Sequence, residues 1–274
     1  SAPQDNSGEK LAGSVILVLS SESLAGEVAD STLPHRWTGS IRGELAGSSL
    51  SCTDDLTGDG IPDLAIGAPF SDGTADGSGR IYVLSGGDLP PSGSLEDASA
   101  RTLQGLSRDS WAGWAVDTGD LDGDGYADIA AGAPGTEDSR GWVLIWDGAD
   151  VAQRGDVFAD YRLRGSSSGD RFGHRVLVED LDQDGLKDLV VGAPRQAQEG
   201  ATEVDALGSI MIFRGAESWV GWRPQMDVDR ASQVQFSDWN GSEGPLEMIS
   251  GDIDGDKTTE LLVLELQQSD TGED

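Results

Sequence analysis

Apolar residues gather in short runs that recur at nearly constant distances along the chain. Four runs follow Gly13, Gly79, Gly141 and Gly208, which are 66, 62 and 67 residues apart, and they read SVILVLS, RIYVLSG, WVLIWDG and SIMIFRG. These runs are short, partly alternating and rich in β-branched and aromatic residues, which indicates strands. No segment shows a convincing helical period, so the pattern predicts an all-β chain. We predict strands at about residues 14–19, 63–67, 80–85, 127–132, 142–147, 187–192 and 209–214.

A different pattern, of carboxylates at alternate positions, comes before the apolar run that ends at Gly132-Ala133-Pro134. Its residues are Asp120, Asp122, Asp124, Gly125 and Asp128. Hard oxygen ligands at this spacing, with a glycine where the chain turns sharply, form a calcium-binding loop. An EF-hand would require Glu at the twelfth position, between two helices. The twelfth residue is Ala131, inside the apolar run, so we predict a nine-residue calcium loop that leads into a strand.

The acidic loop occurs four times, and we name each copy by its first residue. In every copy the seventh position would bind through a backbone carbonyl, which needs no particular side chain. The predicted ligands are Asp55, Thr57, Asp59, Ile61 and Asp63; Asp120, Asp122, Asp124, Tyr126 and Asp128; Asp180, Asp182, Asp184, Leu186 and Asp188; and Asp252, Asp254, Asp256, Thr258 and Glu260.

Two of the four loops depart from the shared pattern. Thr57 gives the Asp55 loop a neutral ligand in place of a carboxylate. In the Asp252 loop, Lys257 stands where a positive φ favours glycine, and Glu260 is one methylene longer than Asp. We therefore expect the Asp120 and Asp180 loops to bind calcium most tightly. The Asp55 loop should bind it more weakly, and the Asp252 loop should be weakest or empty.

The landmarks share a spacing of about 60 residues. Pro3, Pro69, Pro134 and Pro194 keep it, and so do the tripeptides Ile41-Arg42-Gly43, Leu103-Gln104-Gly105 and Leu163-Arg164-Gly165. Four short antiparallel strands in each such unit are typical of a β-propeller blade.

These motifs resemble the FG-GAP repeats of the integrin alpha-subunit propeller and its bacterial relatives. The Phe-Gly pair is intact at Phe172-Gly173 and altered to Ala46-Gly47 and Ala112-Gly113, and Gly-Ala-Pro occurs three times. The resemblance implies an all-β propeller of four-stranded blades, with calcium in a hairpin loop between the first and second strands of a blade.

We expect about four blade equivalents, in residues 1–44 (partial), 45–106, 107–166, 167–241 and 242–274 (partial). Ser1-Ala2-Pro3 resembles the end of a second strand, and residues 261–266 resemble another second strand. We therefore expect a segment of a larger propeller, which has seven blades in the related integrin domains, with remaining blades in a longer chain. A small closed ring is the alternative.

Charge and cysteine content narrow the classes of partner. The formal net charge is −32, and the four loops hold 15 of the 50 acidic residues, so four calcium ions would leave −24. Such a surface repels nucleic acid and anionic lipid, so neither is an expected partner. No apolar run approaches the roughly 18 residues of a membrane span. The single Cys52 excludes an internal disulfide framework, and we expect it to be buried in a strand.

Other candidate motifs carry less weight. Arg154-Gly155-Asp156 matches a tripeptide that many integrins bind, and we expect it in a long turn without a role. His35 and His174 lack the spacing of a zinc site or a catalytic triad, and Asn240-Gly241-Ser242 is a short glycosylation match. Six tryptophans could stack on sugars but are expected to fill wedges between blades: Trp111, Trp114, Trp142, Trp146, Trp219 and Trp222.

The sequence thus predicts an extracellular, calcium-binding propeller that binds an unidentified protein, with the ion in a structural role. The alternative is a carbohydrate-binding propeller, or an accessory domain of a larger secreted enzyme. No catalytic constellation stands out, so we do not predict an enzyme.

Overall fold

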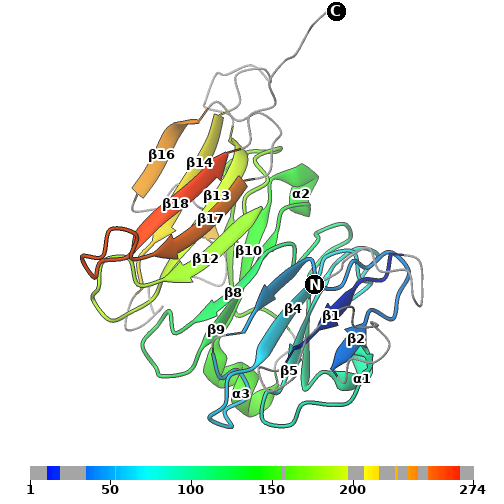
Figure 1. The fold of residues 1–274 in the computed structure, drawn as a ribbon. Coiled ribbons are helices and arrows are strands. Elements are labelled where there is room, and N and C mark those ends of the chain that lie inside the picture. Colours follow the sequence, from blue (N-terminus) through cyan, green and yellow to red (C-terminus); the bar gives the residue numbers. More distant parts are fainter. Residues whose placement is uncertain are drawn as a thin grey trace, which may run out of the picture.

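The computed structural model describes residues 11–18, 35–52, 54–155, 158–196, 207–215, 226–227, 234–239 and 246–265. Within these residues the strands form separate sheets that follow one another along the chain (Figure 1). The first holds β1 (Ser14–Ile16), β2 (Arg36–Thr38) and β6 (Gly93–Ser94). The second holds β3 (Ser49–Ser51), β4 (Leu64–Ala68), β5 (Arg80–Leu84) and β7 (Arg101–Gln104).

Two larger sheets and a hairpin complete this series. The third sheet holds β8 (Val116–Gly119), β9 (Asp128–Ala133), β10 (Trp142–Trp146) and β11 (Tyr161–Arg164), with β15 (Met226–Asp227) parallel to β11. The fourth holds β12 (Arg175–Glu179), β13 (Asp188–Gln196), β14 (Leu207–Phe213) and β16 (Val234–Trp239). The hairpin pairs β17 (Leu246–Gly251) with β18 (Glu260–Glu265). In the described part of the chain, three short helical segments lie between strands: α1 (Leu95–Ala98), α2 (Thr136–Ser139) and α3 (Gly148–Arg154).

The first strands of successive sheets lie next to one another, as expected around the axis of a propeller. β3 contacts β8, β8 contacts β12, and β12 contacts β17. The second, third and fourth sheets each run through four antiparallel strands away from this inner strand. The predicted fold class, an all-β propeller segment built of four-stranded blades, is confirmed.

Apolar side chains fill the spaces between neighbouring blades. One core cluster joins the second and third sheets and includes Val83, Ile129 and Trp146; another joins the third and fourth sheets and includes Phe172 and Phe213. Because neighbours cover both faces of a blade, strands such as β9 and β10 are buried at every residue. This explains the continuous apolar runs and the incomplete alternation in the sequence.

The predicted strands at residues 14–19 to 209–214 correspond to β1, β4, β5, β9, β10, β13 and β14, with small shifts at their ends. Residue 19 lies outside the described residues. The blade limits proposed from the sequence stay a prediction.

Glycines allow adjacent blades to approach closely. A Cβ on Gly132 would lie 1.8 Å from the backbone oxygen of Gly173, and a Cβ on Gly67 would lie 2.0 Å from that of Gly113. Gly113 and Gly173 also have φ values of +87° and +83°, which L side chains rarely adopt. The Gly-Ala-Pro of one blade thus packs its glycine against the Phe-Gly position of the next blade.

The first tripeptide of the repeated series was predicted four residues too far along the chain. Ile41-Arg42-Gly43 lies in a turn after β2, and Gly39 takes the structural position of Gly105 and Gly165. Each of these three glycines donates its amide to the glycine that precedes the third strand. The bonds are Gly39 to Gly13 (3.1 Å), Gly105 to Gly79 (3.0 Å) and Gly165 to Gly141 (3.0 Å). Arg42-Gly43 resembles the Arg164-Gly165 pair in sequence, but it lies in the turn after β2 and not at the end of a strand.

The burial predicted for Cys52 was wrong. β3 ends at the buried Ser51, and Cys52 follows it as an exposed free cysteine. The tryptophans of the third blade fulfil the expected wedge-filling role, because Trp142 and Trp146 are buried in the core between the second and third sheets. Trp111 and Trp114 are half-buried, and Trp219 and Trp222 lie outside the described residues.

The helix α3, which forms two helical turns, was not predicted from the sequence. The Asp147 side chain caps its first turn, and Gly155 ends it in a left-handed conformation with φ 67°. Arg154 is the last helical residue, so the expected long turn at the Arg154-Gly155-Asp156 tripeptide is instead a helix end. Asp156 and Asn240-Gly241-Ser242 lie outside the described residues. In the part of the chain that the structure describes, no helix has both the length and the apolar character to cross a membrane.

Candidate metal centres

Each acidic loop connects the first strand of a blade to the second. The loops follow β3, β8, β12 and β17, and each ends at the start of β4, β9, β13 or β18. Because every one of these pairs is antiparallel, the loops are hairpin connections at corresponding ends of the blades.

The first carboxylate of each loop organises the turn by accepting backbone amides. In the Asp120 loop, Asp120 accepts from Gly123 (2.7 Å) and Gly125 (3.0 Å). The other loops keep this arrangement: Gly60 donates to Asp55 (2.7 Å), Gly185 to Asp180 (3.1 Å) and Lys257 to Asp252 (3.1 Å). These bonds hold the chain in a tight coil whose side chains converge.

The ninth residue of the loop is buried and holds two parts of the blade together. One oxygen of Asp128 accepts the amide of Leu121 (3.0 Å), and the other accepts that of Gly148 (2.8 Å), just after β10. The same pair of bonds recurs at Asp63 from Leu56 and Gly86, and at Asp188 from Leu181 and Gly215. The role of these glycines was not predicted from the sequence. A glycine does end three of the apolar runs, in the pairs Ser-Gly, Asp-Gly and Arg-Gly, and this shared position could have indicated it.

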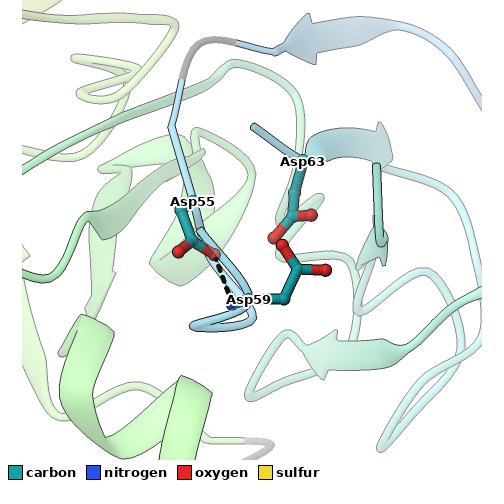
Figure 2. A group of neighbouring side chains, drawn as sticks. All are labelled: Asp55, Asp59 and Asp63. Atoms are coloured by element: carbon teal, nitrogen blue, oxygen red, sulfur yellow. Dashed lines mark hydrogen bonds between the residues drawn. The ribbon is translucent and has the colours of Figure 1, made fainter. Parts of the chain in front are cut away.

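Carboxylate oxygens converge in all four loops. One oxygen from each of three residues lies within 4.8 Å of the others in each cluster. Figure 2 shows this for the Asp55 loop, where the carboxylates of Asp59 and Asp63 point toward one another. The clusters are Asp55, Asp59 and Asp63; Asp120, Asp122 and Asp128; Asp180, Asp182 and Asp184; and Asp252, Asp254 and Glu260.

The structure does not gather every predicted ligand. Asp124, Asp188 and Asp256 lie in the same loops but outside these clusters. Asp124 and Asp256 instead accept amides two residues ahead, from Tyr126 (2.8 Å) and Thr258 (2.7 Å). Ile61, Tyr126, Leu186 and Thr258 occupy the turn after the sixth position, and their ligand role through the backbone carbonyl remains a prediction.

The Asp252 loop keeps the shared backbone despite its altered sequence. Lys257 has a φ of 77°, the left-handed conformation expected for the glycine position. Glu260 also accepts the amide of Ile253 (2.7 Å), as Asp128 accepts that of Leu121. The extra methylene of Glu260 is therefore accommodated, and the strain falls on the backbone of Lys257.

Without a counter-ion, the ionised carboxylates of the Asp120 loop are destabilised by burial and by their mutual repulsion. Burial, with a smaller contribution from the nearby carboxylates of Asp122 and Asp147, raises the pKa of Asp128 to about 8. Burial also raises the pKa of Asp122 to about 6, with added repulsion from Asp124, Asp147 and Asp120. A divalent cation would relieve this repulsion by favouring the ionised carboxylates.

A buried oxygen provides an independent test of the fit. Thr57 Oγ1 is buried without a hydrogen-bond partner, and it occupies a predicted ligand position of the Asp55 loop. Buried polar atoms are usually satisfied, so an unpartnered oxygen in such a loop indicates a missing ligand. Oxygen-only donors from closely spaced carboxylates and a hydroxyl suit calcium or another hard cation. The residues therefore fit the ion that the loop pattern predicts.

Comparison with known proteins identifies the repeats. The family model described as "FG-GAP repeat" matches residues 46–84, 112–144 and 172–204. Over 169 residues the chain is 37% identical to integrin alpha-5 of Xenopus laevis, a match that covers 58% of this chain and 16% of that protein. It is 36% identical to integrin alpha-IIb of Homo sapiens over 170 residues, with the same coverage of both chains.

A relative of another kind is also similar. The chain is 29% identical over 161 residues to phosphatidylinositol-glycan-specific phospholipase D of Bos taurus, covering 55% of this chain and 18% of that protein. The matched region thus spans less than a fifth of the length of each of these relatives. Together with the sheets and hairpin loops described above, these matches show that the chain carries FG-GAP repeats and is similar to integrin alpha chains over somewhat more than half of its length.

Proposed function

We propose that this chain is an extracellular protein-binding module in which calcium has a structural role. The observation that carries the proposal is the convergence of carboxylates in four hairpin loops that share one backbone geometry. Resemblance to integrin alpha chains supports a role in protein binding and adhesion. The proposal assigns no catalytic step to the chain.

Calcium would act by joining the two strands at each hairpin. The carboxylates of Asp120, Asp122 and Asp128 would hold it in the Asp120 loop, with their counterparts in the other loops. Loops of this type in extracellular modules bind calcium at roughly 0.1–1 mM, which suits a calcium-rich compartment. An ion that binds only the folded state adds about 2.7 kcal/mol to the free energy of unfolding at a hundred times its dissociation constant.

Binding to an array of purified extracellular proteins tests the proposed role. We expect saturable binding to at least one protein in calcium and loss of that binding in EDTA. A variant with Asp120→Asn and Asp122→Asn should bind less, because its loop no longer orders the blade edge. Binding that neither EDTA nor the variant changes, or no saturable binding in calcium, would contradict the proposed function.

An aromatic cluster supports carbohydrate binding as a second candidate function. Phe70, Trp111, Trp114 and His174 come from three blades, and the Trp111 and Trp114 ring centroids are 5.8 Å apart. Trp114 also lies 5.5 Å from His174, and all four side chains are half-buried. Half-buried aromatic faces can stack on sugar rings. Similarity to a phospholipase D also supports an accessory domain of a larger enzyme.

A glycan array distinguishes this second candidate. Trp111→Ala and Trp114→Ala should abolish any glycan signal while leaving protein binding intact. Glycan binding that both substitutions leave unchanged would remove the aromatic cluster from consideration.

A further inference from the structure

The residue that follows the third strand faces the acidic loop in each of three blades. The glycine after it is fixed, because its amide donates to the ninth carboxylate of the loop at 2.8–3.0 Å. The preceding residue differs from blade to blade. It is Ser85 beside the Asp55 loop, Asp147 beside the Asp120 loop and Arg214 beside the Asp180 loop.

These three side chains give the loops different electrostatic environments. Ser85 is neutral, and its Oγ donates to Asp59 (3.0 Å). Asp147 is a further negative charge that acts on both Asp122 and Asp128. Arg214 is a positive charge whose Nη1 forms ion pairs with Asp182 and, at 3.9 Å, with Asp188.

The Arg214 guanidinium lies between two predicted ligands of the Asp180 loop. Nη1 is buried, as is the Asp188 side chain that it contacts. Asp188 is also absent from the carboxylate cluster of its loop, whereas its counterparts Asp63 and Asp128 belong to theirs. An arginine stays charged at any pH at which the protein folds, so it permanently offsets one of the carboxylate charges of this loop.

We infer that Arg214 is a built-in cation that takes the place of calcium in the Asp180 loop. With the adjacent residue included, the Asp180 loop has four carboxylates and one positive charge, whereas the Asp120 loop has five carboxylates. The Asp120 loop, with the most carboxylates, is therefore the tightest calcium site. The Asp55 loop follows, because no arginine lies among its ligands, and the Asp180 loop does not depend on calcium, because Arg214 lies between two of its ligands. This order revises the sequence-based expectation, which placed the Asp120 and Asp180 loops together.

The inference rests on the proposed calcium binding, and calorimetric titration of the full chain with calcium chloride tests both. Arg214→Ser reproduces the neutral residue of the Asp55 loop and should add one calcium per chain. Adding Asp182→Asn to that variant should remove the gained site. These two results together assign the gain to the Asp180 loop.

The reciprocal variant is Asp147→Ser, because serine keeps the hydrogen bond by which Asp147 caps α3. It should weaken the tightest site by about tenfold or more, because one nearby negative charge is lost. In the parent chain, Asp184→Asn should leave the calcium stoichiometry unchanged.

The outcomes separate the two proposals. If the parent binds calcium and Arg214→Ser adds no site, the inference about Arg214 is overturned and the proposed calcium binding stands. If neither protein binds calcium, both are overturned. A gained site that persists with Asp182→Asn would place it in another loop and would also overturn the inference.

Discussion

Substitution of Gly132 by alanine tests whether the Gly-Ala-Pro glycine sets the distance between blades. The added Cβ would lie 1.8 Å from Gly173 O and 2.8 Å from Gly173 C, both backbone atoms of the next blade. Reaching even 3.0 Å requires a shift of about 1.2 Å between two packed sheets, and no flexible side chain can absorb it. Overpacking of this kind costs about 3 kcal/mol in the free energy of unfolding.

Thermal denaturation in calcium gives the measurement. A loss of about 3 kcal/mol lowers the Tm of a chain of this size by about 6–12 °C. Gly251→Ala is the control, because it is also a strand glycine but a Cβ there meets no atom within 4 Å. We expect the control to change the free energy of unfolding by no more than about 0.5 kcal/mol. Equal Tm values for Gly132→Ala and the parent would refute the close packing of Gly132 against Gly173.

Phe172→Ala should reduce the free energy of unfolding by about 3–5 kcal/mol in urea, because the ring is fully buried against Phe213; a loss below about 1 kcal/mol would contradict this. Desolvation of the half-buried His174, with the nearby charges of Arg175 and Arg171, lowers its pKa to about 4, so its contribution to stability is present above pH 6.5 and is lost as the pH falls toward 4. From about pH 7 to pH 5 the parent should lose about 2 kcal/mol more than His174→Phe, and equal losses would show that His174 is not the cause. Asp124→Ala should lower the Tm in calcium more than Asp256→Ala, and a difference that persists in EDTA would exclude calcium as its source.

Strands with apolar runs were predictable, and those with mixed composition were not. β5 and β10 are buried on both faces, so residues 81–84 and 142–146 read as uninterrupted apolar runs. β3 and β8 have the sequences SLS and VDTG and show no such run. These two inner strands pack through small and polar side chains. Ser51, for example, bonds to both Asp117 (3.0 Å) and Thr118 (2.9 Å) in the next blade. Such bonds depend on how blades pack, which a local pattern does not encode.

The candidate metal sites were also predictable only in part. The carboxylate clusters within one loop were predictable, because the spacing alone sets the coil that brings Asp120 and Asp122 together. The partners that come from the end of the third strand were not predicted, because Gly148 and Arg214 are 20 or more residues away from the carboxylates that they contact. Cys52 was misplaced for a related reason, since the sequence does not mark where β3 ends.

The central claim is that the acidic loops are ion sites that stabilise the propeller. The most direct measurement is the Tm of the intact chain in about 5 mM calcium and in EDTA, because each site with a dissociation constant near 0.1 mM then adds about 2 kcal/mol. We predict that calcium raises the Tm by at least about 5 °C, and that a variant with Asp120→Asn and Asp122→Asn loses a large part of this rise. An unchanged Tm on addition of EDTA would show that these loops are acidic turns which bind no ion.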